Sequence, residues 1–488
     1  MIPNPEFRAH ARALSFHPFL AVALAVALAV ALSAPAPGEA QQLQPHQQLA
    51  RDVFKELIEI NTTDGSGDNT KAAEAMAARF RAAGFPAADI FVAGPHPRKG
   101  NVVVRYRGRS STQKPLLLLA HIDVVEAKKE DWSSNLDPFV FTERDGYYYG
   151  RGTTDDKAMS AIFVANLLRM KQQGLVPERD IILALTADEE SGDHNGVDWL
   201  LKNHRARVDA EYGLNEGGNG LARGGRNIAN QVQASEKVYV DYRLESTNPG
   251  GHSSRPTRDN AIYHLTEALT RIGQHQFPVK LNEVTRGYFQ RMAGIEQGQL
   301  AADFRAIAQT TPNATALERM AAIPYFNAMM RTTCVATMVN AGHAPNALPQ
   351  RATANVNCRI LPGEDPAEVQ RTLERVIANP KVTVTPEGEA RPSSPSPLRP
   401  DVMGPIEKLT QQLWPGVPVV PVMSTGATDG LYFRQAGIPI YGVSGLFGDM
   451  DDVRAHGRDE RIGIKEFYDG QEFLWRLVNE LTGARPAT

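Results

Sequence analysis

The stretch Pro115-Leu116-Leu117-Leu118-Leu119-Ala120-His121-Ile122-Asp123 decides the fold, because an apolar run stops abruptly at a histidine and an aspartate. Such a run is typical of a strand buried on both faces. Two further strand-like runs end in the same way, 181–187 at Asp188-Glu189-Glu190 and 210–215 at Glu216-Gly217-Gly218. In an open α/β sheet, ligands bind beyond the carboxyl ends of the strands. We therefore expect these three polar clusters to converge on one site.

Imidazole and carboxylate groups together favour a metal centre. The candidate ligands are His121, Asp155, Glu190, Glu216 and His456. These groups suit zinc or a similar divalent ion, and buried carboxylates are costly unless they are paired or bound to metal. Each cluster alone is also compatible with an incidental pair or a solvated helix face. Two ions about 3.5–4 Å apart can hold and activate a water, so Glu189 and Glu190 suit a division between proton transfer and metal binding. Asp123 is near enough to His121 to accept a hydrogen bond from the imidazole.

A long helix is predicted over residues 156–173, directly after the Asp155 turn. Thr153, Thr154 and Asp155 offer capping oxygens at its start. The acidic pair at this turn is also compatible with charges favoured by the helix dipole. Lys157 is a candidate partner for these aspartates.

Length and charge exclude several classes of protein. The chain has 488 residues, which is too many for a single core. Its hydrophobic fraction of 42% and charged fraction of 22% are ordinary for a globular protein. A formal net charge of −3 gives no support for a nucleic-acid partner or an anionic membrane surface.

The N-terminal residues 1–40 have the layout of a secretory signal peptide. Arg8 and Arg12 precede an apolar run over 19–32, and small residues and prolines follow it. The run has about 14 residues, fewer than the roughly 20 that a membrane-spanning helix needs. We expect cleavage near Gln41, an exported periplasmic or secreted protein, and no stable membrane span after cleavage. An uncleaved anchor is the alternative.

Export makes the two cysteines informative, because an oxidising compartment permits a disulfide. Cys334 and Cys358 lie in two strand-like runs, 332–339 and 352–360, joined by a turn-rich stretch. If the runs form a hairpin, the thiols face each other. We favour a disulfide over the alternative of two small buried core residues.

The order of predicted elements divides the mature chain into two domains, one of them discontinuous. Residues 41–233 alternate helices and strands, which predicts a mainly parallel sheet. Residues 234–386 read strand, helix, strand, strand, helix, strand, the order of a ferredoxin-like domain. A largely helical segment over about 274–330 interrupts it. Helix and strand alternate again over 387–488, so the fold class is α/β with an inserted α+β domain.

At these residues the chain resembles the metallopeptidase family that includes glutamate carboxypeptidase G, yeast carboxypeptidase S, acetylornithine deacetylase, succinyl-diaminopimelate desuccinylase and aminoacylase. The resemblance covers nearly all of the chain after the signal and is strongest to the carboxypeptidase S-like branch. Its motifs are at 119–123, 149–157, 186–192, 215–218, 250–254, 346–349, 359–363 and 455–457.

The resemblance implies a zinc-peptidase catalytic domain, an inserted lid or dimerisation domain, and two Zn²⁺ ions, with Co²⁺ or Mn²⁺ as substitutes. Asp155 would bridge the two ions. His121 and Glu216 would complete one site, and Glu190 and His456 the other.

The family pattern also implies catalytic and substrate-binding roles. Glu189 would be the general base and acid, beside Asp123 in the catalytic set. His252, from the inserted domain, would stabilise the oxyanion, often across the interface of a homodimer; the alternative is a plain loop histidine. Arg359 would receive the substrate carboxylate, unless it forms a structural ion pair. The full set expected to line the substrate site is Asn346, Arg359, Gly426 and Thr428.

The leading hypothesis is an exported di-zinc metallopeptidase or amidohydrolase. It would cleave the amide bond of dipeptides, of the C-terminal residue of short peptides, or of N-acyl amino acids by metal-activated water. The alternative enzyme is a dedicated N-acyl amino acid deacylase. A third hypothesis is a homologue that binds peptides without turnover, and the intact Glu189 argues against it.

Overall fold

The computed structural model describes residues 42–110, 112–190 and 193–487. The chain divides into a unit of residues 1–45 and a unit of residues 46–488, and the second unit contains the fold described here. The predicted signal peptide, residues 1–40, lies outside the described residues. Across the part of the chain that is described, no helix is long and apolar enough to cross a membrane.

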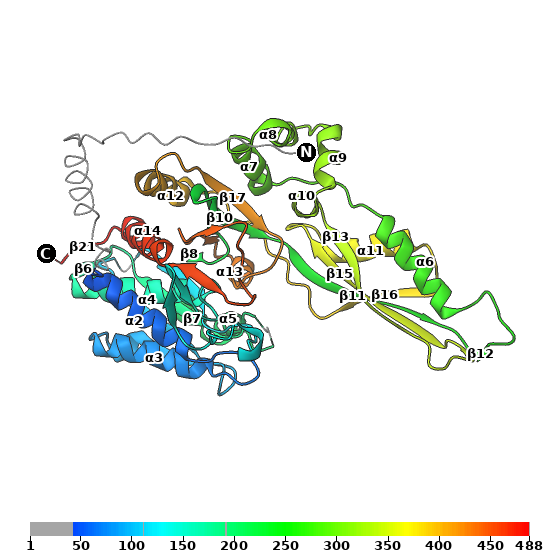
Figure 1. The fold of residues 1–488 in the computed structure, drawn as a ribbon, viewed down its shortest axis with the longest axis horizontal. Helices are drawn as coiled ribbons and strands as arrows, with labels where there is room; N and C mark the ends of the chain where they lie inside the picture. Colours follow the sequence, from blue (N-terminus) through cyan, green and yellow to red (C-terminus); the bar gives the residue numbers. More distant parts are fainter. Residues whose placement is uncertain (1–41, 111, 191–192, 488) are drawn as a thin grey trace, which may run out of the picture. The chain divides into compact units, whose positions relative to one another are not determined.

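A ten-stranded sheet forms the centre of the larger part of the molecule (Figure 1). Its order is β1-β2-β7-β3-β8-β18-β10-β9-β19, and β17 pairs with β10. The strands β7, β3, β8 and β18 run parallel, whereas β1–β2, β2–β7, β18–β10 and β10–β9 are antiparallel. The expected mixed α/β fold with a mainly parallel sheet is therefore confirmed. The strands are β1 (Ile90–Ala93), β2 (Asn101–Tyr106), β3 (Leu116–His121), β7 (Ile181–Thr186), β8 (Tyr212–Asn215), β9 (Gly220–Arg223), β10 (Arg226–Glu236), β17 (Val419–Ser424), β18 (Ile440–Gly442) and β19 (Phe447–Asp449).

Helices cover both faces of the sheet, which explains why the central strands are apolar throughout. Leu116 and Leu118 of β3 face one hydrophobic core, and Leu117 and Leu119 face another. The helices of the first core are α2 (Pro45–Glu59), α3 (Asn69–Ala82), α4 (Lys157–Gln172), α12 (Pro400–Leu413) and α14 (Ile464–Thr482). The second core contains residues of α5 (Gly196–Val208) and α13 (Gly430–Gln435).

The start of α4 differs from the sequence-based prediction. Its N-cap is Asp156, and no side chain caps it. The Thr153 hydroxyl donates to the Gly150 carbonyl, and the Thr154 hydroxyl donates to Glu460. Lys157 makes no ion pair with the aspartates; its buried ammonium donates to the carbonyls of residues 57 and 60 at the end of α2. Thr154 and Lys157 thus bind partners far along the chain, and Thr153 bonds within its own turn, instead of capping the helix.

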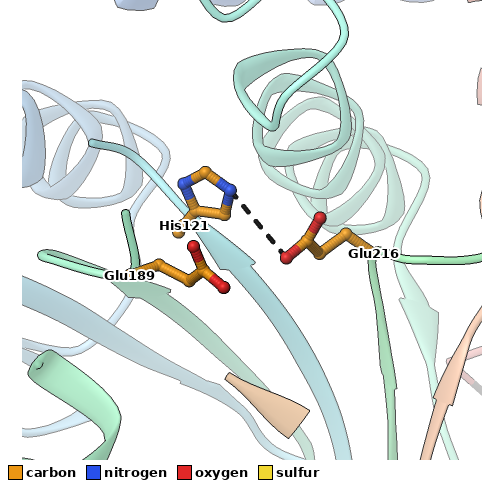
Figure 2. A group of neighbouring side chains, drawn as sticks. All are labelled: His121, Glu189 and Glu216. Atoms are coloured by element: carbon orange, nitrogen blue, oxygen red, sulfur yellow. Dashed lines mark ion pairs between the residues drawn. The ribbon is translucent and has the colours of Figure 1, made fainter. Parts of the chain in front are cut away.

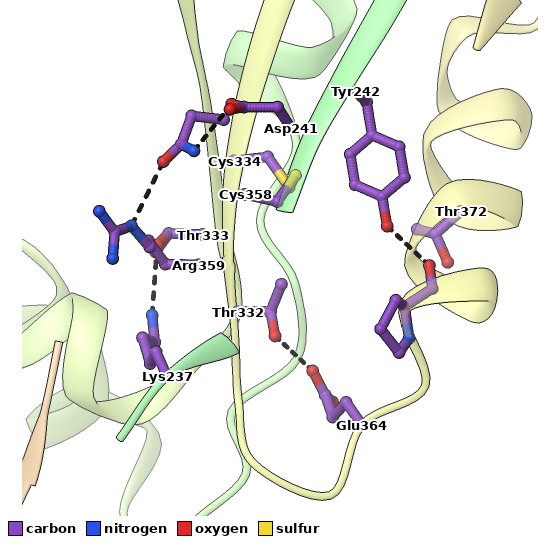
Figure 3. Close-up of a disulfide and its surroundings, with 12 residues drawn as sticks. Lys237, Asp241, Tyr242, Thr332, Thr333, Cys334, Cys358, Arg359, Glu364 and Thr372 are labelled. Atoms are coloured by element: carbon purple, nitrogen blue, oxygen red, sulfur yellow. Dashed lines mark hydrogen bonds between the residues drawn. A yellow bond between two sulfur atoms is a disulfide. The ribbon is translucent and has the colours of Figure 1, made fainter. Parts of the chain in front are cut away.

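The inserted segment forms a separate four-stranded antiparallel sheet of order β13-β15-β11-β16. The strands are β11 (Val238–Thr247), β13 (Thr333–Ala341), β15 (Arg351–Ile360) and β16 (Val382–Glu387), with α6 (Ala261–Gln274) and α11 (Pro366–Ile377) packed on one face. This is the predicted ferredoxin-like order. Cys334 of β13 pairs with Cys358 of β15, and the two form a disulfide (Figure 3), as expected.

The segment expected to be helical forms four helices: α7 (Glu283–Met292), α8 (Gly298–Ile307), α9 (Ala314–Ala321) and α10 (Pro324–Met330). Its core includes Ala229 of β10 and Val420 and Val422 of β17. The insertion therefore covers part of the large sheet, although in sequence it interrupts the small one.

Short strand pairs complete the fold and fix loops. β4 (Thr142–Arg144), β5 (Tyr147–Tyr149) and β20 (Arg461–Gly463) form a three-stranded sheet, in which Arg461 pairs with Tyr149. That pairing places the loop before β20 beside the loop after β5. β12 (Gly251–His252) pairs with β14 (Ala347–Leu348), and β6 (Leu175–Val176) with β21 (Arg485–Pro486).

Lys237 lies where the chain crosses from the large sheet to the small one, after the end of β10 and before the start of β11. Its side chain is buried, and its ammonium donates to the Thr333 hydroxyl at 3.2 Å. Burial and, to a smaller extent, the nearby Arg359 lower the pKa of Lys237 to about 7, although Glu364 opposes the shift. The folded state therefore favours the neutral amine.

We predict that Lys237→Met changes how stability depends on pH. Since the folded pKa is below the ordinary value of 10.5, the unfolded state holds an extra proton between about pH 7 and 10.5, and wild-type stability rises with pH in this window. Below about pH 7, Lys237 is protonated in both the folded and the unfolded state. The full free-energy cost of burying its charge then destabilises the folded protein. The free energy of unfolding of Lys237→Met should exceed that of wild type most below pH 7, and the difference should shrink toward pH 10.

The exposed Lys114, paired with Asp209, gives the matched control Lys114→Met, which should follow the wild-type curve. Denaturant titrations at several pH values measure the effect. Parallel curves for wild type and Lys237→Met would contradict the prediction.

Candidate metal centre and active site

Three neighbouring parallel strands end at or just before the first candidate ligands. β3 ends at His121, β7 is followed by Glu189 and Glu190, and β8 is followed by Glu216. Because β7, β3 and β8 are neighbours and run parallel, their carboxyl ends meet at one edge of the sheet. Figure 2 shows the carboxylates of Glu189 and Glu216 beside the His121 ring, with the ion pair between His121 and Glu216 dashed.

Asp155 connects two histidines that are far apart in sequence. Its Oδ1 lies 2.9 Å from His121 Nε2, and its Oδ2 lies 3.0 Å from His456 Nε2. His121 Nε2 is also 3.9 Å from Glu216 Oε1, and His456 Nε2 is 2.9 Å from Glu190 Oε1. These contacts link the five predicted ligands to one another through Asp155.

The spacing of these donor atoms fits divalent ions. Donors about 2.0–2.2 Å from a tetrahedral zinc ion lie roughly 3.3–3.6 Å from one another, close to the 2.9–3.9 Å separations found here. The donor atoms of His121, Asp155 and Glu190 lie within 4.8 Å of one another, and so do those of His121, Glu189 and Glu216. Geometry alone therefore allows Glu189 to act as a ligand or as a base.

The charges of these side chains, like the spacing of their donor atoms, favour a divalent ion. Burial raises the pKa of Glu189 well above its ordinary value, although the imidazole of His121 opposes this, and burial together with Asp155 does the same to Glu216. Asp155 has a lowered pKa because hydrogen bonds to the two histidines outweigh its burial, and the same contacts with Asp155 and Glu190 raise the pKa of His456 to about 10. The cluster carries more carboxylates than cations. A divalent ion would balance this excess.

Asp123 joins two of the ligands. Its backbone carbonyl lies 3.1 Å from His121 Nδ1, closer than its carboxylate Oδ1 at 3.5 Å. The carboxylate was the expected acceptor, but its Oδ2 instead accepts from the backbone N–H of Glu190 at 3.0 Å. Asp123 thus orients the His121 ring and the Glu190 backbone together.

Glu460 is a functional candidate that the sequence-based reasoning missed. This carboxylate is fully buried and accepts from the Arg151 guanidinium at 2.7 Å. It also accepts from the backbone N–H groups of Gly152, Thr154 and Asp155 at 3.1, 2.8 and 3.3 Å. Glu460 therefore ties the loop that carries Asp155 to the loop that carries His456. Its position in the sequence, four residues after the candidate ligand His456, could have identified Glu460 as part of the site.

The expected substrate residues do not all lie in this cluster. His252 lies exposed on β12 and Asn346 lies exposed just before β14, where the Ser253 N–H donates to the Asn346 carbonyl at 3.0 Å. The hydroxyl of Thr428 is buried and donates to Glu236 at 2.9 Å. The Gly426 N–H donates to the Ser424 hydroxyl at 3.0 Å.

Arg359 lies on the face of the small sheet opposite α6 and α11. Its guanidinium stands 4.5 Å from the centre of the Tyr239 ring, and its Nε donates to Asn357 at 3.4 Å. Asn357 and the Tyr239 hydroxyl both donate to Asp241, at 2.9 and 2.6 Å. Arg359 forms no ion pair within the described residues, so the alternative of a structural ion pair has no support there.

Comparisons with known proteins agree with this geometry. The sequence model of Peptidase family M20/M25/M40 matches residues 117–480. The chain is 31% identical over 384 residues, covering 77% of this chain and 74% of the relative, to N-fatty-acyl-amino acid synthase/hydrolase PM20D1 of Xenopus tropicalis. It is 28% identical over 394 residues, 78% of this chain and 74% of the relative, to probable carboxypeptidase S-like 2 of Dictyostelium discoideum.

Among solved structures, the fold is similar to that of an M20 family metallo-carboxypeptidase, Sso-CP2, from Sulfolobus solfataricus. The TM-score is 0.65 at 18% identity, covering 89% of this chain and 99% of that one.

We predict that Glu460→Gln weakens metal binding without unfolding the protein. The amide keeps the shape of the carboxylate but loses the charge that holds Arg151 and the Asp155 loop. Groups that orient metal ligands typically contribute about 10–100-fold in metal affinity, so a loss of that size is expected in a titration against a competing chelator.

The matched control is Glu143→Gln, because Glu143 pairs with Arg51 at an exposed position and should bind metal as wild type does. Unchanged metal affinity in Glu460→Gln would show that the two loops hold their places without this carboxylate.

Proposed function

Because the chain belongs to Peptidase family M20/M25/M40 and is a metal-dependent hydrolase, we propose that it is a di-zinc enzyme. It cleaves the amide bond of dipeptides, of the C-terminal residue of short peptides, or of N-acyl amino acids. The observation that carries the proposal is Asp155, whose two carboxylate oxygens face His121 and His456 separately. An ion held on each side would lower the pKa of water at the site and make a nucleophile available near neutral pH.

The ligand roles follow from the contacts. His121 and Glu216 would hold one ion and Glu190 and His456 the other, with Asp155 shared. His121 is buried, whereas the side chain of His456 is 51% exposed. We therefore infer that substrate approaches from the His456 side. Co²⁺ and Mn²⁺ offer the same coordination chemistry as substitutes for Zn²⁺.

Glu189 is the proposed general base and acid. With Asp155, His121 and Glu216 assigned to one ion, the Glu189 carboxylate beside them remains free to move protons. Burial holds the pKa of Glu189 well above its ordinary value, which brings a carboxylate closer to the pH at which it can both accept and return a proton.

Arg359 is the proposed receptor for the substrate carboxylate, and Asn346, Gly426 and Thr428 are the other proposed substrate contacts. A planar guanidinium binds a carboxylate bidentately, and stacking on Tyr239 would orient it. The names of the similar proteins include both a carboxypeptidase S-like protein and an N-fatty-acyl-amino acid hydrolase. Both substrate classes carry a free carboxylate beside the amide, so a dedicated N-acyl amino acid deacylase is the second candidate. Turnover of dipeptides and long-chain N-acyl amino acids, measured side by side, separates the two.

His252 is the proposed oxyanion donor, and a homodimer is the proposed assembly. β13 is an edge strand of the small sheet with exposed Val335, Met338 and Val339, a surface suited to a second copy. His252 contacts Ser254, whose hydroxyl lies 2.8 Å from its Nδ1, and within the described residues it makes no hydrogen bond to the candidate metal ligands. It would therefore reach the reaction by closure of the small domain or from the partner subunit.

Export to the periplasm or the exterior is part of the proposal. The Cys334–Cys358 disulfide supports it, because structural disulfides persist in oxidising compartments.

We predict that Glu189→Gln retains two metal ions per chain and loses most turnover. General acid–base groups contribute about 10²–10⁴-fold to rate, and the amide cannot take up the proton. Metal content by elemental analysis and kcat on a dipeptide and an N-acyl amino acid measure the two properties. Loss of metal would make Glu189 a ligand, and near-normal turnover would remove it as the base.

Asp155→Asn is the comparison variant, because loss of the shared charge should reduce metal content together with activity. A wild-type protein that binds both substrates but turns over neither, with zinc or cobalt supplied, would support the peptide-binding homologue instead.

We predict that His252→Ala binds two metals and fails in kcat. Removal of an oxyanion donor typically costs about 10²–10³ in turnover. If the histidine acts across a dimer, mixing His252→Ala with Glu189→Gln chains should restore part of the activity through hybrid dimers. Ser253→Ala, one residue away, serves as the control and should keep wild-type turnover. Unchanged kcat in His252→Ala would leave it a plain loop histidine.

A further inference from the structure

Lys99 is a buried cation whose partner directly precedes the proposed base. Its side chain is only 5% exposed and contacts two carboxylates, those of Asp188 and Asp64. Asp188 is fully buried, whereas Asp64 is 57% exposed and lies 2.6 Å from the ammonium. Burial lowers the pKa of Lys99, but hydrogen bonds to the two carboxylates outweigh it and raise the value overall. Lys99 therefore stays charged in the folded protein.

Asp188 has an unusual backbone. Its φ is +68°, in the left-handed region that a residue with a Cβ seldom adopts. Such a conformation costs of order 1–3 kcal/mol and persists only where its surroundings fix it. One carboxylate oxygen of Asp188 accepts from Lys99, and the other accepts from the His194 N–H at 2.5 Å. The side chain is thus held from both sides.

The neighbours of Asp188 are held by other residues. The preceding residue, Ala187, donates its N–H to the Asn101 side chain at 2.9 Å, and Glu190 donates its N–H to Asp123 at 3.0 Å. No backbone contact of this kind is found for Glu189 within the described residues. The backbone of Glu189 thus lies between the left-handed turn at Asp188 and the Glu190 N–H that donates to Asp123.

We infer that Lys99 is a positioning residue for Glu189, acting through the Asp188 carboxylate and the left-handed turn that it stabilises. Without the ammonium, a fully buried carboxylate loses its cation, and breaking one side of a buried pair is strongly destabilising for the group left behind. The turn would relax, and Glu189 would move relative to His121 and Glu216. This inference rests on the proposed role of Glu189 as the base.

The test compares Lys99→Met and Lys99→Arg in the zinc-loaded enzyme. Misplacement of a catalytic group by about 1 Å can cost about 10²-fold. Lys99→Met should lower kcat at least about ten-fold, with KM and the two bound metals unchanged, and Lys99→Arg should recover part of the loss. Lys408→Met, at an exposed lysine paired with Glu480, is the matched control and should behave as wild type. Wild-type kcat in Lys99→Met would overturn the inference.

A second comparison distinguishes positioning from general damage. If Lys99 acts through Glu189, then Lys99→Met should change the residual rate of a Glu189→Gln enzyme by less than about two-fold, because coupled residues are not additive. An equal fold-loss in both backgrounds would overturn the inference. A Glu189→Gln enzyme with near-normal turnover would instead refute the proposed base, whatever Lys99→Met does.

Asp188→Asn keeps the test decisive if Lys99→Met does not fold. The amide retains an oxygen for the His194 N–H but loses the ion pair, so kcat should fall with metal content unchanged. Asp64→Asn removes only the exposed partner and should leave kcat within about two-fold of wild type. Wild-type kcat in Asp188→Asn would overturn the inference as well.

Discussion

The excess of negative charge at one edge of the sheet is the constraint on which the rest of the site depends. Asp155, Glu189, Glu190 and Glu216 converge there with two imidazoles, and burial together with neighbouring carboxylates holds the pKa of Glu189 and Glu216 high. Carboxylates in such surroundings must be neutralised by protons, cations or metal. Divalent ions held by these residues would neutralise them without protonating Glu189, so one arrangement would serve both the proposed metal binding and the proposed proton transfer.

Charge balance explains attraction to the metals, but the positions of the ligands are set by a surrounding layer of buried polar groups. Glu460 joins the loops of Asp155 and His456, and Asp123 joins His121 to the backbone of Glu190. In each case one group restrains two ligand segments that are distant in the sequence. The ligand loops are therefore fixed relative to one another, in addition to their own strands, as precise metal geometry requires.

The central strands and the polar clusters at their ends could be predicted because their signals are local: an apolar run and the polar residue that ends it stand side by side in the sequence. The restraining residues could not, since Lys99 and Asp188 are 89 positions apart and Arg151 and Glu460 are 309 apart. Two predictions from local sequence were wrong for the same reason, because the partners of these residues are distant in the sequence. Thr154 and Lys157 looked like helix-capping and charge-pairing groups, yet Glu460 and the end of α2 are their partners. The disulfide could be predicted because its two cysteines lie in strands that pair as a hairpin, which is a local motif.

The proposed oxyanion donor, His252, lies in a different part of the fold from the candidate metal ligands. Every candidate ligand is tied into the large sheet or its loops, whereas His252 lies exposed on β12 and Asn346 lies exposed just before β14. A group that stabilises charge only in the transition state raises kcat, while equal binding of substrate and transition state does not. If His252 is the oxyanion donor, its place in the small domain would reserve that contact for the reaction. The proposed metal binding would then not depend on substrate, whereas the proposed oxyanion stabilisation would.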